Sequence, residues 1–307
     1  MTQSSAPAPL PINPLHVQRQ FSRRGDLSEA QFLYGEIARR MDERLRLIRL
    51  QPSKMLDAGC GAGHQFALLH QRYPQATYTG QDFNPDLLAK AKKLVQAQQP
   101  GGLRQWIDRF KGDLPKVEWL QADLARTTLT PESLELVWSN LALHWHPSPH
   151  DVLAEWGRIL KINGLAFFSC FGPATMKELR LALEQADLKT ATPAFVDMHD
   201  FGDLLVEKGF ADPVMDQEIL TLTYSTPEKL LQDVRALGGN PAIGRQAGLR
   251  GRLWRQRLLN ALETQRKSDG KIHLTVEVAY GHAWRAATLR TAPGETRISV
   301  NAIKRKN

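Results

Sequence analysis

The chain has 307 residues, which is enough for one large domain or for one domain with a substantial insertion. Charged residues make up 23% of the sequence and no apolar run approaches the length of a membrane span, so contact with a membrane is not expected. The two cysteines, Cys60 and Cys170, are few and isolated, which is usual in a reducing compartment and predicts a cytoplasmic location. The formal net charge of +8 raises the question of an acidic partner.

The N-terminal segments predict a tail followed by helical structure. Residues 1–16 are rich in Ser, Ala and Pro and lack the basic start and apolar core of a signal peptide, so we expect a flexible tail. Residues 17–50 are predicted to form a helical lid. Within it, Gln31–Leu50 has apolar residues at helical spacing, and residues 15–30 are expected to fold over a bound ligand.

Residues 54–63 read KMLDAGCGAG, which predicts a strand, a tight turn and then a helix over Gln65–His70. Glycine in such a turn lets the backbone approach a ligand closely. The spacing is G-x-G-x-G, which differs from the G-x-G-x-x-G of dinucleotide-binding turns. Asp57 just before the glycines suits a cationic or amine-bearing ligand. S-adenosylmethionine, which has a sulfonium and an α-amino group, is such a ligand.

Two more acidic residues follow predicted strand ends. Asp82 comes after a strand over Thr77–Gly80, about 20 residues past the glycines, where a carboxylate accepts hydrogen bonds from ribose hydroxyls. Asp123 follows a third strand and is placed to meet an adenine amino group. A fourth strand is predicted over Leu134–Ser139. The predicted cofactor-binding residues are Asp57, Gly59, Gly61, Gly63, Asp82, Asp123, Leu124, Asn140 and Leu141.

The elements continue with a helix over Asp151–Leu160, a stop at Lys161–Gly164 and a fifth strand over Leu165–Ser169. This order resembles a class I S-adenosylmethionine-dependent methyltransferase. The resemblance implies an α/β fold with a Rossmann-like seven-stranded sheet, an antiparallel closing hairpin and a helical insertion after strand five. A doubly wound domain that binds another nucleotide, or none, is the alternative.

The second half of the chain is predicted to supply helices and the closing strands. The predicted helices cover Thr175–Leu188, Asp200–Lys208 and Pro227–Leu237, and the predicted strands cover Pro213–Thr223 and Leu274–Ala287. These boundaries give a core over 51–170 that binds S-adenosylmethionine, substrate-side cap helices with the closing strands over 171–290, and a C-terminal tail over 291–307.

Basic residues concentrate between Arg235 and Lys271, where only Glu263 and Asp269 are acidic. A solvated helix face explains this pattern, and so does docking of an acidic macromolecule such as RNA, DNA or an acyl carrier protein. The basic residues are Arg235, Arg245, Arg250, Arg252, Arg255, Arg257, Arg266, Lys267 and Lys271. No metal site is expected, because the cysteines are isolated and the histidines of residues 144–150 lie in a Pro-interrupted loop.

Four blocks together resemble the malonyl-acyl carrier protein O-methyltransferases of biotin synthesis: Trp138–Trp145, Phe171–Arg180, Val234–Asn240 and Leu274–Val276. The resemblance runs from about residue 17 to 286. It implies S-adenosylmethionine-dependent methylation of the free carboxyl of a malonyl thioester, which disguises that carboxyl as an ester. It also implies an acidic acyl carrier protein with a malonyl thioester as the partner, in preference to nucleic acid.

The same blocks resemble a mitochondrial complex I assembly factor related to methyltransferases. The match includes the Leu143–Trp145 and Glu178–Arg180 endings. Biotin-pathway members commonly have a Tyr in the N-terminal lid, and Arg23–Leu27 has none. The alternative functions are therefore a protein-modifying or assembly factor, or a methyltransferase with another acceptor.

The malonyl assignment predicts catalytic residues as well. A carboxylate is already a nucleophile at neutral pH, so the enzyme needs to position it more than to deprotonate it. Arg235, just before a glycine pair, is the predicted bidentate clamp for the carboxylate, with Arg180 as the competing choice and a surface ion pair as the alternative for both. Trp145 is predicted to form a pocket wall, and His144 is a candidate general base.

Overall fold

The computed structural model describes residues 9–98, 116–246, 248 and 250–287. The C-terminal tail predicted over 291–307 lies outside these residues, as do the first eight residues of the predicted N-terminal tail. None of the helices within the described part of the chain is long and apolar enough to cross a membrane.

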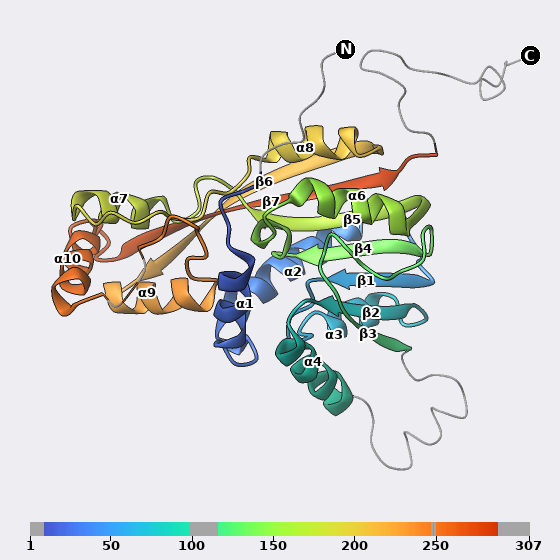
Figure 1. The fold of residues 1–307 in the computed structure, drawn as a ribbon, viewed down its shortest axis with the longest axis horizontal. Coiled ribbons are helices and arrows are strands. Elements are labelled where there is room, and N and C mark those ends of the chain that lie inside the picture. Colours follow the sequence, from blue (N-terminus) through green and yellow to red (C-terminus); the bar gives the residue numbers. More distant parts are fainter. Residues whose placement is uncertain (1–8, 99–115, 247, 249, 288–307) are drawn as a thin grey trace, which may run out of the picture.

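One seven-stranded sheet forms the centre of the molecule, in the order β3-β2-β1-β4-β5-β7-β6 (Figure 1). The first five strands are parallel, and β7 is antiparallel to both of its neighbours. The strands are β1 Lys54–Ala58, β2 Thr77–Asp82, β3 Val117–Gln121, β4 Leu134–Asn140, β5 Leu160–Phe171, β6 Phe210–Tyr224 and β7 Ile272–Arg285. The predicted class I methyltransferase fold is therefore confirmed. The strand order reverses between β1 and β4, and ligands of open α/β sheets bind at the carboxyl ends of strands around such a point.

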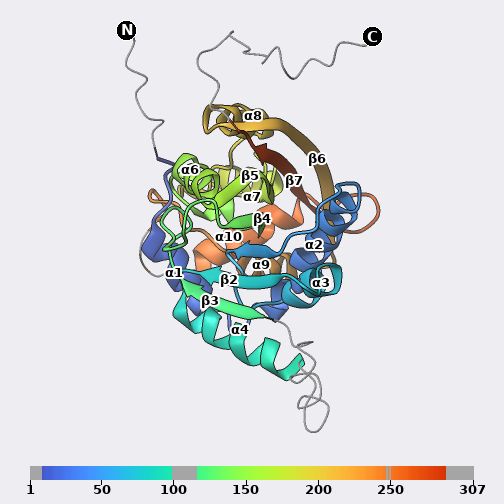
Figure 2. The same cartoon turned by 90° about the vertical axis from the view of Figure 1, so that its right-hand side faces the viewer.

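Helices cover both faces of the sheet because neighbouring residues of its central strands are apolar and point in opposite directions. Met55 packs in a cluster with α2 and α3, and Leu56 packs in a second cluster with α6 and α8. Figure 2 shows α2 and α3 on one side of the strands and α6 on the other. The helices are α1 Pro14–Ser22, α2 Gln31–Leu45, α3 Phe66–Arg72, α4 Pro85–Gln98, α6 Pro149–Ile159, α7 Lys177–Gln185, α8 Met198–Glu207, α9 Pro227–Ala236 and α10 Arg252–Glu263, with 3₁₀ turns η1 Ser28–Ala30 and η2 Leu143–Trp145.

Strands β6 and β7 extend past the rest of the sheet and support a separate group of helices, which we call the cap (α7, α9 and α10; Figure 1). A third hydrophobic cluster holds the cap to the strands. It contains Tyr224 of β6, Ile272 and Leu274 of β7, and buried leucines of the three helices. The molecule thus consists of an α/β sheet with its covering helices and a cap, and the long strands β6 and β7 join the two.

The segment just before α1 connects the cap to the loops at the sheet. Leu10 donates a backbone hydrogen bond to the carbonyl of Pro147 (2.7 Å), and Asn13 donates one to Pro241 (3.1 Å). Ile12 also forms an antiparallel bridge with Ala242 of the cap. We call residues 10–13 the strap.

Several elements differ from the sequence predictions. Residues 10–16, predicted as part of a flexible tail, form the strap and the start of α1. Helix α2 ends at Leu45, short of the predicted Leu50. Strand β5 begins at Leu160, so Lys161–Gly164 is not a helix stop; it is an irregularity inside the strand, where Asn163 adopts a left-handed conformation (φ 63°) and the pairing shifts. Helix α10 was not predicted, because arginines on its exposed face obscure its buried leucines.

Candidate functional site

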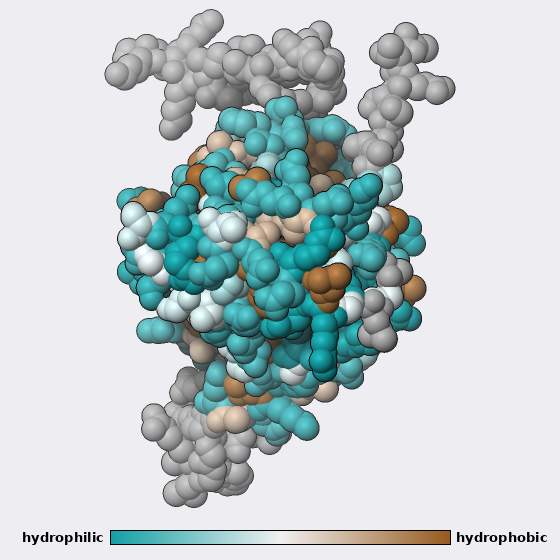
Figure 3. Space-filling model, turned by 90° about the vertical axis from the view of Figure 1, so that its left-hand side faces the viewer, coloured by the Kyte–Doolittle hydropathy of each residue, from teal (hydrophilic) through white to brown (hydrophobic). Residues whose placement is uncertain are grey.

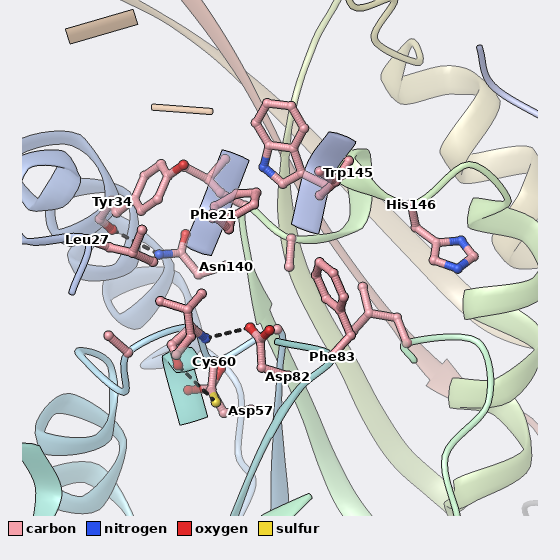
Figure 4. Close-up of a pocket in the computed structure, with 18 of the residues that line it drawn as sticks. Phe21, Leu27, Tyr34, Asp57, Cys60, Asp82, Phe83, Asn140, Trp145 and His146 are labelled. Atoms are coloured by element: carbon pink, nitrogen blue, oxygen red, sulfur yellow. Dashed lines mark hydrogen bonds between the residues drawn. The ribbon is translucent and has the colours of Figure 1, made fainter. Parts of the chain in front are cut away.

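A cavity of about 200 Å³ lies at the carboxyl ends of β1, β2 and β4. Helix α1 and the start of α2 form its remaining walls. Figure 4 shows Phe21, Tyr34 and Trp145 at one end of the cavity and Asp57 and Asp82 at the other. Its lining comprises Pro14, Val17, Phe21, Leu27, Gln31, Tyr34, Asp57, Gly59, Cys60, Gly61, Ala62, His64, Gln65, Asp82, Phe83, Leu87, Asp123, Leu124, Asn140, Leu141, Ala142, Trp145, His146 and Pro147.

The three glycines of the turn have positive φ angles of 78°, 54° and 80°. A Cβ atom at Gly59 would lie 2.3 Å from the Cβ of Ala142, and one at Gly63 would lie 3.0 Å from the Cβ of Ala91. Glycine is therefore needed at these two positions because Ala142 and Ala91 of the protein itself approach the turn closely. The sequence had suggested the close approach of a ligand as the reason for the glycines. Gly59 and Gly61 line the cavity, and Gly63 does not.

Asp82 is buried and receives two backbone hydrogen bonds. Its Oδ2 accepts from the amide of Gly61 (2.9 Å) and its Oδ1 accepts from the amide of Asn84 (2.8 Å). Burial nevertheless raises the pKa of Asp82 to about 6. Each carboxylate oxygen has a further lone pair, so the group has the acceptor capacity that a pair of ribose hydroxyls needs.

Asp57 is almost fully buried, and a single side-chain hydrogen bond reaches it, from the hydroxyl of Tyr78 (2.7 Å). Desolvation raises its pKa to about 7, and the nearby Asp82 adds to that rise. A buried carboxylate with so few donors is stabilised by a cation placed beside it. This acceptor fits the ammonium or sulfonium charge of S-adenosylmethionine.

Asp123 lies at the rim of the cavity, where 53% of its side chain is exposed. Its Oδ1 pairs with Nε2 of His146 (3.1 Å) and accepts from the amide of Ala125 (2.8 Å). The hydrogen bond from His146 lowers the pKa of Asp123. Sequence reasoning considered His146 only as a metal ligand and did not find this pair. The sequence signal for this pair was that both residues are polar and follow a predicted strand, Asp123 after the third and His146 after the fourth.

Asn140 and Leu141 line the cavity, but the Asn140 side chain is engaged within the protein. Its Nδ2 donates to the carbonyl of Tyr34 (2.9 Å), and its Oδ1 accepts from the hydroxyl of Ser169 (2.9 Å). The amide of Leu141, a residue with φ of 53°, donates to the same hydroxyl (3.1 Å). Asn140 therefore fixes α2 against β4 and β5 at the cavity wall.

Trp145 forms part of the aromatic wall of the cavity. Its ring lies edge-on to Phe21, with 5.7 Å between ring centroids. A Cβ atom at Gly238 would lie 2.1 Å from the Trp145 ring, so the cap approaches this tryptophan closely only because residue 238 is glycine. The hydroxyl of Tyr34 also reaches the cap, donating to the carbonyl of Leu237 (2.7 Å).

The structure does not bring His144 to the cavity. The ring is fully buried between Trp145, Phe171 and Phe195, and its Nδ1 accepts a hydrogen bond from the amide of Phe171 (3.3 Å). Burial lowers the pKa of His144 to about 3, so the imidazole is neutral. A base this weak and this far from solvent is packing for the η2 turn.

Neither predicted carboxylate clamp lies at the cavity. Arg235 is exposed at the end of α9, and Arg180 donates to the carbonyls of Thr175 and Pro173 (2.6 Å each). The block around Arg180 has a structural role, since the amide of Ala174 donates to the carboxylate of Glu277 (2.5 Å). Among the residues that the structure describes, neither Lys nor Arg lines the cavity, and no cluster of His, Cys, Asp and Glu could hold a metal ion.

Comparisons with known proteins agree with this geometry. A family profile described as a methyltransferase domain matches residues 56–168. The YcgJ protein of Bacillus subtilis has a similar fold, with a TM-score of 0.54, 14% identity and coverage of 81% of this chain and 98% of that chain. Phosphoethanolamine N-methyltransferase 2 of Haemonchus contortus, solved in complex with S-adenosyl-L-methionine, gives a TM-score of 0.54 at 13% identity, covering 88% of this chain and 60% of that chain.

A curated relative is much closer in sequence. The malonyl-[acyl-carrier protein] O-methyltransferase of Laribacter hongkongensis is 44% identical over 259 residues, which cover 84% of each chain. That likeness extends well beyond residues 56–168 of the matched domain. The chain belongs to the malonyl-[acyl-carrier protein] O-methyltransferase family.

Proposed function

We propose that this protein transfers a methyl group from S-adenosylmethionine to the free carboxylate of a malonyl group carried on an acyl carrier protein, an early step of biotin synthesis. The observation that carries the proposal is the 44% identity to a malonyl-[acyl-carrier protein] O-methyltransferase across 84% of both chains. We further propose that the enzyme works in the cytoplasm, in keeping with two buried free thiols, Cys60 and Cys170.

The cavity fits the cofactor. In our assignment Asp82 accepts hydrogen bonds from the ribose hydroxyls, Asp123 meets the adenine amino group at the rim, and Asp57 faces positive charge. Leu124, Asn140 and Leu141 form walls, and the glycine turn shapes the floor. We assign residues 17–50 as a lid, 51–170 as the cofactor-binding core and 171–290 as the substrate-side part.

The chemistry asks little of the protein beyond positioning. A carboxylate oxygen takes the methyl carbon, while the bond from that carbon to the sulfonium sulfur breaks and leaves a neutral thioether. No proton moves, so no general base is required, and a buried neutral His144 is compatible with the reaction. The aromatic wall of Phe21, Tyr34 and Trp145 excludes water from the acceptor carboxylate. Water bound to the carboxylate would slow its attack on the methyl group.

The cap offers a docking surface for an acidic carrier. Within the described ranges, the ion pairs along α9 and α10 are Lys229–Asp233 and Arg266–Glu263. Six arginines between residues 235 and 257 have no ion-pair partner among the described residues, and we call them the cap arginines. They are Arg235, Arg245, Arg250, Arg252, Arg255 and Arg257.

One of the cap arginines, Arg245, lies beside α1, which forms a wall of the cavity. Arg245 donates to Nδ1 of His16 on α1 (3.2 Å), and both Arg245 and Arg235 help to lower the pKa of Arg250, whose main cause is burial. Figure 3 shows this end of the molecule as mainly hydrophilic. A carrier bound here presents its thioester arm beside α1 and the aromatic wall.

The intact mass of malonyl-acyl carrier protein after incubation with the enzyme and S-adenosylmethionine tests the proposal. We expect a gain of one methyl group on the malonyl carrier. Acetyl-acyl carrier protein, which has no free carboxyl, is the control and should gain nothing. Absence of any gain on the malonyl carrier, with cofactor binding intact, refutes the proposed acceptor.

A further inference from the structure

Arg24, in the turn after α1, has a buried guanidinium without a partner. Its Nη1 and Nη2 atoms are both shielded from solvent, and neither makes a hydrogen bond within the described part of the chain. Burial lowers the pKa of Arg24 from its ordinary value, and the nearby Tyr34 opposes that change. An arginine nevertheless stays protonated in proteins, so the Arg24 guanidinium is a buried cation that an anion would stabilise.

The guanidinium lies behind the aromatic wall of the cavity. Its Cζ is 4.7 Å from the ring centroid of Phe21, whose ring packs against Trp145. On the cap side, a Cβ atom at Gly239 would lie 3.4 Å from Nη2 of Arg24. The group therefore sits between the wall residues and the glycine pair of the cap, opposite the acidic end of the cavity.

A second unpartnered donor lies on the same wall. Nε1 of Trp145 is buried and has no acceptor among the described residues. By contrast, the cavity lining holds three carboxylates, Asp57, Asp82 and Asp123, which suit the cofactor's positive charge and repel an anion. The two ends of the site thus have opposite preferences, and the missing partner at the aromatic end is a group rich in acceptor oxygens.

We propose that the Arg24 guanidinium binds the free carboxylate of the methyl acceptor. This inference rests on the proposed function and assigns to Arg24 the clamp role for which the sequence suggested Arg235. A guanidinium grips a carboxylate through two parallel hydrogen bonds, so it holds one oxygen in a fixed direction. Because the cation contacts the carboxylate from the cap side, the oxygen facing the cofactor end stays free to react.

The test compares the affinities of malonyl- and acetyl-acyl carrier protein in the presence of S-adenosylhomocysteine, measured by calorimetry. The wild type should prefer the malonyl form by about 10–100-fold, the range for hydrogen bonds between charged groups. Arg24→Gln should abolish this preference and Arg24→Lys should restore part of it. Arg23→Gln, which neutralises the exposed neighbouring arginine, is the matched control and should keep the full preference.

Thermal melting separates binding from folding. Because the guanidinium is unpaired in the free protein, Arg24→Gln should melt no lower than the wild type. A retained malonyl preference in Arg24→Gln overturns the inference, and so does an equal loss of both ligands with a lowered melting temperature. The binding preference is independent of turnover. If the wild type binds malonyl-acyl carrier protein but does not methylate it, the proposed function is refuted. The comparison of the Arg24 variants then still tests whether Arg24 binds the carboxylate.

Discussion

The buried carboxylate of Asp57 should make the ligand-free protein less stable as the pH rises. Its pKa increases from 3.8 in an exposed chain to about 7 in the fold. The folded state therefore binds more protons than the unfolded state between these values, and the free energy of unfolding falls as the pH rises through that window. At about 1.4 kcal/mol for each pKa unit, the full penalty approaches about 4 kcal/mol by pH 8.

Asp57→Asn removes the charge and keeps an oxygen for the hydroxyl of Tyr78. Urea unfolding of the ligand-free proteins should show the stability of the variant rising relative to that of the wild type by about 2.5 kcal/mol between pH 5 and pH 8, because most of the penalty accrues over this interval. Asp82, whose pKa also rises, to about 6, adds a pH dependence of its own to both proteins.

The same substitution should weaken the binding of S-adenosylmethionine. A cationic ligand stabilises ionised Asp57, so wild-type affinity for S-adenosylmethionine should strengthen from pH 5.5 to pH 8, and Asp57→Asn should lose about 10–100-fold at the upper end. Parallel unfolding curves for wild type and variant at every pH would show that Asp57 carries no such penalty, and the reasoning from burial would be wrong.

Three further outcomes follow from the site. Asp82→Ala should weaken S-adenosylmethionine binding by about 1.5–3 kcal/mol in calorimetry, and unchanged affinity excludes the ribose contact. Gly63→Ala should cost about 1–2 kcal/mol of stability, because it forces a Cβ into a left-handed residue at 3.0 Å from a neighbouring Cβ; an unchanged melting temperature contradicts this. Replacing Arg250, Arg252 and Arg255 by Ala should raise KM for the carrier-bound substrate and flatten its dependence on salt, since exposed charges mainly steer encounter. Equal losses on a small malonyl thioester indicate a folding defect instead of a docking role.

The cofactor end of the site was accessible to sequence reasoning because its signals are local. Asp57 and Asp82 each follow an apolar run directly, and parallel strands bring their carboxyl ends to one edge. The reason for the glycines was less accessible. Gly63 is required by the approach of α4, a contact between segments that no spacing rule connects.

The aromatic end of the cavity was less accessible to sequence reasoning, because it is assembled from distant segments and neither Arg235 nor Arg180 lies there. Arg235 precedes a glycine pair, and the sequence could not show that Gly238 of this pair, and not the arginine, meets Trp145. Arg24 had no motif to distinguish it from Arg23, since their difference is burial alone. The partner of Asp123, His146, likewise depends on how two loops meet.

The strap at residues 10–13 has a consequence for the order of events in turnover. It hydrogen-bonds to Pro147 at the cavity and to Pro241, which lies between the cap arginines Arg235 and Arg245. Helix α1, which the strap precedes, lines the cavity, so we expect exchange of spent for fresh cofactor to involve release of one of the two attachments of the strap. In the function proposed above, a carrier docked on the cap arginines would hold the attachment to Pro241. We therefore expect cofactor exchange to precede carrier binding, which gives compulsory-order kinetics with S-adenosylmethionine as the first substrate.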